Sequence, residues 1–254
     1  MKAVLAASFL VLAAPALAQR SETFSPPLPY VSLQFQGHQS QIEVGPGVPW
    51  LFSGLIMHPA AFNHPVKVDF DIAGEAALEV SLRTERRREV AVKFDRIHEP
   101  LEPLTLGVND KLHLAWRLPA ETTKKLPPGR YEAILTVRTS RGAAYGEPVG
   151  ITVRESPARD DAYYRGRDAL ARGAHREALK ETAAVLEQRP NDVQTLILRA
   201  EIFESQGEIR KAIKALDAAE KVILKHPSSN GRVPYDLLDY QARLRSKLQT
   251  KEAP

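Results

Sequence analysis

Cysteine is absent from the 254-residue chain. Without a thiolate the protein has no thiol nucleophile, no cysteine-ligated zinc and no iron–sulfur cluster. It also has no disulfide, so an exported protein of this length must depend on its hydrophobic core. A lipid-anchored bacterial lipoprotein needs a cysteine directly after its signal, and that kind of anchor is therefore excluded.

Several motifs that mark enzymes are missing as well. The one glycine-rich turn, Gly45-Pro46-Gly47, contains a proline that removes an amide donor which a phosphate-binding loop needs. Neither a Gly-x-Ser-x-Gly elbow nor a His-Glu-x-x-His zinc motif occurs. We therefore predict that the protein is not an enzyme and has no cofactor.

The seven histidines are scattered, and only His58 and His64 lie close together in the sequence. Two imidazoles joined by a loop could bind a metal if a carboxylate such as Asp69 or Asp71 came close. Each of these histidines precedes a proline, which favours extended backbone and a plain loop. We favour the loop and predict no metal site.

An excess of charge of one sign is also lacking, since 35 Lys and Arg face 31 Asp and Glu. A net charge of +4 is too small to indicate nucleic acid as a partner. The densest basic run has Arg83, Arg86, Arg87 and Arg88 between two predicted strands, at a hairpin tip. Either it contacts anionic envelope polymers or an acidic partner, or it is a solvated turn with flanking glutamates; we favour the solvated turn.

Residues 1–18 have the features of a secretory signal. A lysine at position 2 is followed by a short apolar run and by the small-x-small site Ala16-Leu17-Ala18. The run is shorter than the roughly 20 apolar residues that cross a bilayer, so cleavage before Gln19 is favoured over an uncleaved anchor. No later stretch is long enough to span a membrane. We predict a periplasmic or secreted protein, in a Gram-negative bacterium.

Residues 19–155 have the pattern of an antiparallel β-sandwich. Apolar residues alternate with polar ones, which indicates strands with one buried and one solvated face. Seven or eight short strands separated by turns over this length are typical of a sandwich. The alternating positions are Val66 to Ile72, Leu78 to Leu82, Val90 to Phe94, Leu112 to Leu118, Tyr131 to Val137 and Val149 to Val153, with further strands at 30–35 and 50–57.

The pattern changes at residues 156–160, which read as a linker. Before them, the segment from Trp116 through Leu126-Pro-Pro-Gly-Arg-Tyr131 resembles the late strands of bacterial immunoglobulin-like domains. This resemblance implies a β-sandwich module of the kind found in envelope and surface proteins. It implies no catalytic residue.

Residues 161–254 contain an internal repeat. Gly173 and Gly207 lie 34 residues apart, and so do Ala178 and Ala212. This period and these residues resemble the tetratricopeptide repeat, which implies two helical hairpins. An ordinary five-helix bundle is the alternative. Two repeats are fewer than the usual three, so we expect the array to pack on the β domain or to join a partner's repeats.

The repeat positions have physical roles. Glycine supplies the left-handed residue that ends a helix, and alanine fits where two helices cross. We expect Pro190 to close the second helix and Asp192 to cap the next one. The repeat-packing residues that we predict are Gly166, Gly173, Ala178, Pro190, Gly207 and Ala212. Residues 235–249 are expected to form a capping helix with one apolar face made by Leu237, Leu238, Gln241, Leu244 and Leu248.

The inner groove of such an array is lined by the first helix of each repeat. Chaperone-binding relatives grip a peptide carboxylate there with lysines and asparagines, which this chain lacks. The resemblance therefore favours a helix or an extended segment of modest charge as the ligand. Alternatively, these residues are a solvated face or pack against the β domain. The predicted groove residues are Tyr163, Arg167, Leu170, Gln194, Ile197, Glu201 and Glu204.

From these features we predict a non-enzymatic, exported protein–protein interaction or scaffold protein whose partner lies in the cell envelope. One alternative is a structural module that braces a larger surface complex. Another is a carbohydrate-binding β domain, for which Trp50, Trp116 and Tyr145 are the candidate aromatic residues. Trp116 alternates with leucines, so we expect it in the core.

Overall fold

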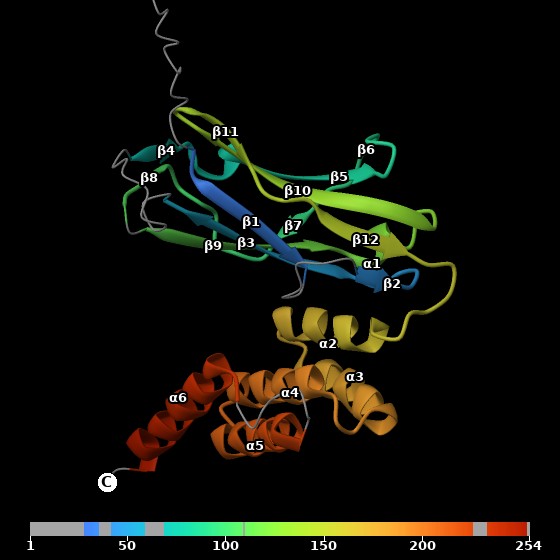
Figure 1. Ribbon diagram of the computed structural model, residues 1–254, viewed down its shortest axis with the longest axis vertical. Coiled ribbons are helices and arrows are strands. Elements are labelled where there is room, and N and C mark those ends of the chain that lie inside the picture. Colours follow the sequence, from blue (N-terminus) through green and yellow to red (C-terminus); the bar gives the residue numbers. More distant parts are fainter. Residues whose placement is uncertain (1–27, 36–41, 59–68, 109, 226–232, 253–254) are drawn as a thin grey trace, which may run out of the picture.

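The computed structural model describes residues 28–35, 42–58, 69–108, 110–225 and 233–252. Two β-sheets come first in the chain and helices packed in pairs follow, as Figure 1 shows. This confirms the predicted order of a β part followed by an α part. The signal segment and His64 lie outside the described residues.

The β part consists of two sheets. The first sheet has the strand order β1 (Tyr30–Phe35), β3 (Trp50–Met57), β9 (Lys111–Leu118) and β7 (Asp95–Arg96), with every pair antiparallel. The second runs β2 (Ile42–Val44), β12 (Val149–Val153), β10 (Gly129–Thr139), β4 (Phe70–Ile72) and β8 (Leu104–Leu106). β10 also pairs with β11 (Gly142–Tyr145) and β5 (Leu78–Thr84), and β5 pairs with β6 (Glu89–Val90). Short helical turns lie at η2 (Gly74–Ala77) and α1 (Ala120–Thr123).

The core of the β part lies between the two sheets, and period-two alternation places its side chains there. On β10, for example, Tyr131, Ala133, Leu135 and Val137 are all buried. The first sheet contributes aromatic rings that meet edge to face, which is a favoured aromatic geometry. Phe35 and Phe52, for instance, have ring centroids 5.3 Å apart.

One predicted strand is wrong. The alternation from Val90 to Phe94 predicted a continuous strand, yet β6 ends at Val90 and the next strand, β7, begins at Asp95. The intervening residues cross from the second sheet to the first. The ring of Phe94 lies 5.7 Å from that of Phe52 on β3, so the alternating apolar residues contact both sheets during the crossing.

The helical part contains five helices in the described residues: α2 (Asp161–Ala171), α3 (His175–Gln188), α4 (Val193–Ser205), α5 (Ile209–Lys225) and α6 (Tyr235–Glu252). α2 packs with α3, and α4 packs with α5. Both hairpin turns end the first helix in the same way. Gly173 and Gly207 have φ near +70°, and paired backbone hydrogen bonds across each turn form a Schellman motif.

Other residues of the predicted repeat lie at helix ends and in the helical core. Pro190 follows α3, and the carboxylate of Asp192 accepts a hydrogen bond of 2.9 Å from the backbone N–H of Thr195 at the start of α4. Ala178 and Ala212 are fully buried. The shared face predicted for α6 is wrong in one residue, because Leu238 is 40% exposed. Its neighbour Leu237 is buried as expected, and adjacent helical residues point about 100° apart, so the two cannot share one face.

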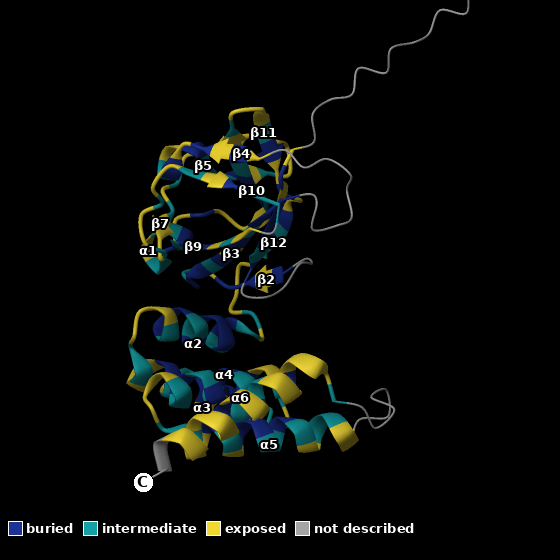
Figure 2. Ribbon diagram, turned by 90° about the vertical axis from the view of Figure 1, so that its left-hand side faces the viewer, coloured by how far each residue is buried: buried dark blue, intermediate teal, exposed yellow. Residues whose placement is uncertain are grey.

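α2 lies between the sheets and the remaining helices in both views (Figures 1 and 2). Tyr164 of α2 belongs to the same apolar cluster as Phe35 of β1 and Leu198 of α4. The β part and the first helices therefore share one continuous core. None of the helices in the described ranges is long and apolar enough to cross a membrane.

Candidate functional site

One side of α2 faces the β part. Asp161 is buried, and its carboxylate accepts hydrogen bonds from the backbone N–H groups of Gly45, at 2.8 Å, and Ala158, at 2.7 Å. The ring of Tyr164 meets that of Phe35 edge to face at 5.2 Å. Burial raises the pKa of Tyr164 above its ordinary value.

Glycine at position 45 is required by this contact. A Cβ there would lie 2.8 Å from Cα of Pro157 and would collide with the carboxylate of Asp161. The residues that we predicted as a linker therefore lie against the β part at this point.

About two turns further along α2 from Asp161, Asp168 forms a second link. Its side chain is only 3% exposed and forms a bidentate ion pair with Arg117 of β9. Arg172 adds a hydrogen bond of 2.9 Å from Nε to the same carboxylate. Two guanidinium groups thus satisfy one buried carboxylate, as an ion at such a site requires.

The adjacent side of α2 faces α4, where we predicted a groove. Tyr163 is 8% exposed, so it is part of the core rather than an open surface. Burial raises the pKa of its hydroxyl, and the nearby Arg167 opposes this rise. Arg167 Nη1 lies 2.5 Å from Glu201 Oε2 and joins α2 to α4. At Tyr163 and Arg167 the groove is therefore filled by the protein's own side chains.

Glu204, further along α4, is bound to α6. Its carboxylate accepts hydrogen bonds from Tyr240 Oη at 2.8 Å and Lys247 Nζ at 2.7 Å, and Arg243 lies at 3.1 Å. Burial acts to raise the pKa of Glu204, but the hydrogen bonds from Lys247 and Tyr240 outweigh it and lower the pKa. This residue holds the last helix on the array.

The other three predicted groove residues are Leu170, Ile197 and Gln194. Leu170 and Ile197 are half-buried and pack on apolar clusters, and Gln194 is exposed. The seven predicted residues thus lie along α2 and α4. Four of them are held by the burial of Tyr163, the Arg167–Glu201 pair and the Glu204 cluster, and two more pack on apolar clusters.

The aromatic residues considered for sugar binding are mostly in the core. Trp50 is fully buried and Trp116 is 4% exposed, whereas Tyr145 is 66% exposed. His58 is buried against the ring of Phe70 at 5.2 Å. In the part of the chain that the structure describes, no group of three potential ligands could hold a metal ion.

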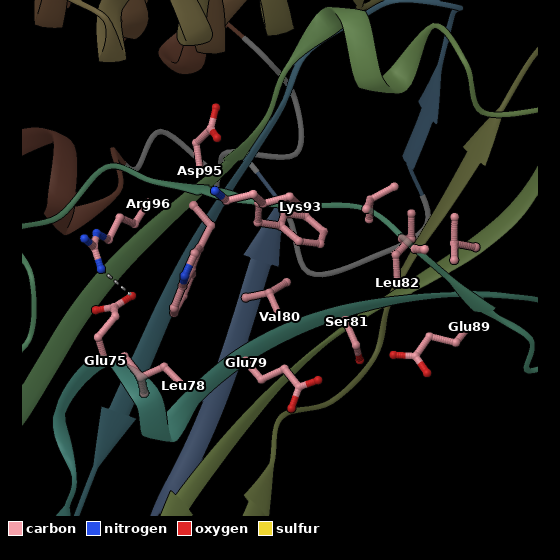
Figure 3. Close-up of a pocket in the computed structure, with 15 residues that line it drawn as sticks. Glu75, Leu78, Glu79, Val80, Ser81, Leu82, Glu89, Lys93, Asp95 and Arg96 are labelled. Atoms are coloured by element: carbon pink, nitrogen blue, oxygen red, sulfur yellow. Dashed lines mark ion pairs between the residues drawn. The ribbon is translucent and has the colours of Figure 1, made fainter.

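Sequence reasoning missed a cleft of about 700 Å³ on one side of the β part, shown in Figure 3. It lies between β5 of the second sheet and the crossing residues that lead to β7 of the first. Its lining includes half-buried Leu78, Val80, Val92 and Phe94, together with buried Trp116. The ion pair of Glu75 with Arg96, at 3.8 Å, lies at one end.

The cleft exists because β6 leaves β5 after two residue pairs. Leu82 and Arg83 of β5 pair with β6, and the chain then turns toward the first sheet. Within the described ranges, the outer edge of β5 has no neighbouring strand from Leu78 to Ser81. No local signal in the sequence marks this point, because the apolar alternation continues from Val90 to Phe94.

The basic run forms the tip of the hairpin between β5 and β6, as predicted. Arg87 has φ of 58°, and its N–H donates to the carbonyl of Thr84 at 2.7 Å. Arg86, Arg87 and Arg88 are all exposed. No carboxylate among the described residues forms an ion pair with any of these three, in agreement with a solvated tip.

Neither a family profile nor a curated protein matches the sequence. A family 123 glycoside hydrolase from Clostridium perfringens is 11% identical with a TM-score of 0.31, and the match covers 52% of this chain and 28% of that one. Spo0M, a sporulation control protein from Bacillus subtilis, is 11% identical with a TM-score of 0.33, over 57% and 56% of the two chains. MyfA, the major subunit of Myf fimbriae from Yersinia enterocolitica, is 8% identical with a TM-score of 0.25, over 50% and 98%. Likeness at this level carries no argument about function.

Proposed function

We propose that this chain is an exported, non-enzymatic scaffold that holds a protein partner in the bacterial cell envelope. The observation that carries the proposal is the double role of α2, which packs on β9 through Asp168 and on α4 through Arg167. Parts of a chain usually move relative to one another unless their interface is large and apolar. A shared core opposes such motion, so the surfaces of the two parts stay in a fixed position relative to each other and are presented together to a partner.

Two resemblances support this role. The helical part resembles tetratricopeptide repeats, which bind proteins on extended surfaces, and the β part resembles the immunoglobulin-like modules of envelope proteins. The predicted signal at residues 1–18 supports an address outside the cytoplasm. Cell fractionation followed by mass spectrometry of the mature protein tests the address, and we expect Gln19 as its first residue.

The face shared by α2 and α4 is tested by exchanging one ion pair. The double substitution Arg167→Glu and Glu201→Arg keeps an ion pair between the two positions but exchanges the places of the positive and the negative charge on the surface. The full-length double variant should fold like the wild type and should lose a partner that binds this face. Capture from a periplasmic extract, compared by mass spectrometry, gives the measurement. Retention of every wild-type partner would count against this face as the contact surface.

A second function, a structural module that braces a larger surface complex, is favoured by the internal pairing of the groove residues. Arg167, Glu201 and Glu204 all have partners within the chain. If the helices only brace the β part, the exchanged pair leaves partner binding intact. The same experiment therefore separates the two functions.

A further inference from the structure

The cleft beside β5 combines features that a partner's backbone would complete. We propose that it binds an extended, apolar segment of a partner protein, flanked by basic residues, which adds to β5 as a further strand. The inference rests on the proposed function, because it supplies a binding site for the partner of the scaffold.

The backbone of β5 has peptide groups on its outer edge that no strand among the described residues pairs with. The N–H of Thr84 donates to the carbonyl of Arg88 on the outer edge, at 2.9 Å. Because peptide groups alternate in direction along a strand, the N–H and C=O of Val80 also point outward on that edge. There, within the described ranges, no strand receives them. Only another extended backbone satisfies both groups in sheet geometry.

The apolar side chains along the cleft are only partly covered. Figure 3 shows Val80 pointing toward the crossing segment that carries Lys93, whereas Glu79 and Ser81 point to the other side of β5. Val80, Val92 and Phe94 are half-buried, although Leu82 on the same face of β5 is fully buried. The core is therefore incompletely covered along the cleft, and apolar side chains of an added strand would cover it.

The cleft and the unpaired stretch of β5 are large enough for a short extended segment. The unpaired stretch from Leu78 to Ser81 is long enough for about 13 Å of added strand at the usual rise per residue. The cleft volume of about 700 Å³ lies in the range of pockets that hold ligands of this size. An extended segment of a few residues thus fits without opening the sandwich.

Charge indicates what flanks this segment. Glu75, Glu79, Glu89 and Asp95 line the cleft, against Lys93 and Arg96, but Glu79 points to the other side of β5 and pairs with Arg138. Arg96 already pairs with Glu75, and no ion pair of Glu89 or Asp95 is present in the described part of the chain. An acidic rim favours lysine or arginine beside the apolar residues of the partner.

The test uses the full-length mature chain and a synthetic peptide with alternating valine and threonine between two lysines. We expect the peptide to bind and to slow the hydrogen exchange of the Val80 amide about tenfold or more, since a new hydrogen bond protects it. The same peptide with N-methylated valines keeps its side chains but lacks the valine N–H donors that would face β5. It should bind at least about tenfold more weakly.

Two proline variants locate the site on the protein. Val80→Pro removes the outward donor on β5, whereas Ala143→Pro removes an outward donor on β11, a different edge of the same sheet. Only Val80→Pro should weaken peptide binding. Thermal unfolding checks that both variants are folded, and the N-methylated peptide keeps the test decisive if one is not.

Several outcomes would overturn the inference. These are no binding at about 1 mM peptide, equal binding of the N-methylated peptide, and protection of β11 amides instead of Val80. Self-association of the chain that protects Val80 without peptide would replace the partner by a second copy. In each case, loss of an envelope partner from the Arg167 and Glu201 exchange would still support the scaffold, so the two proposals fail separately.

Discussion

Replacing Asp168 by alanine tests whether α2 joins the two parts of the molecule. The change removes the carboxylate that binds Arg117 of β9 and Arg172 of α2. Breaking a buried ion pair costs about 3–5 kcal/mol. The Arg117 and Arg172 side chains are 21% and 37% exposed, so water can solvate them after the change. We therefore expect the lower end, about 3 kcal/mol of unfolding free energy.

The two parts can be followed separately in one urea titration. Both tryptophans, Trp50 and Trp116, lie in the β part, so their fluorescence reports on that part alone. Far-ultraviolet circular dichroism reports mainly on the helices. In the wild type the two transitions should coincide, because the core is continuous. In Asp168→Ala the helical transition should move to lower urea and separate from the tryptophan transition.

Glu43→Ala is the matched control. It removes the Glu43–Arg154 pair, in which both side chains are half-exposed or more, so its effect should stay below about 1 kcal/mol. If Asp168→Ala shifted neither transition more than this control does, the reasoning about the buried link would be refuted. A large shift in which both transitions still coincide would mean that Tyr164 and Phe35 maintain the coupling by themselves.

Three further predictions concern single contacts. Glu204→Gln should speed the exchange of backbone amide hydrogens in α6, because it weakens the hydrogen bonds of Glu204 with Tyr240 and Lys247, each worth about 1 kcal/mol. Acidification should have the same effect. The pKa of Glu204 is lowered in the folded protein, so its contribution is full above the unfolded pKa and is lost as the pH falls through the folded one. Gly166→Ala should be neutral or should raise the unfolding free energy by about 0.5–1 kcal/mol, since a Cβ would make ordinary contacts of 3.5 Å with Glu181 and Leu198; a drop in thermal midpoint would contradict this. Gly45→Ala should cost about 1–3 kcal/mol by urea unfolding, because its Cβ collides with Asp161.

Local patterns predicted most of the elements. Alternation located β5, β9, β10 and β12, and the 34-residue spacing located both helical hairpins with their glycine ends. These features depend on contacts within a strand or a turn, so residues that are close together in the sequence specify them. The strand predicted from Val90 to Phe94 is absent, because its alternating apolar residues pack against two sheets. Which sheet each residue contacts depends on strands that lie far away in the sequence.

The candidate site was predicted less well. The seven groove residues were placed on the correct helices, but the spacing could not show that Arg167 and Glu201 pair or that α6 binds Glu204. Those contacts depend on side chains from different helices. The cleft beside β5 follows from the point at which β6 separates from β5, which no local pattern specifies.

The position of α2 has a consequence for how this chain could be divided or inherited. A cut at the change of pattern near residue 156 would leave Phe35 without the ring of Tyr164, and Arg117 without its carboxylate. Each fragment would expose surface that is normally interior, and such surface invites aggregation and proteolysis. Recombination that exchanged the β part alone would face the same problem, so only pieces that carry β1, β9 and α2 together could be shuffled between proteins as a working unit.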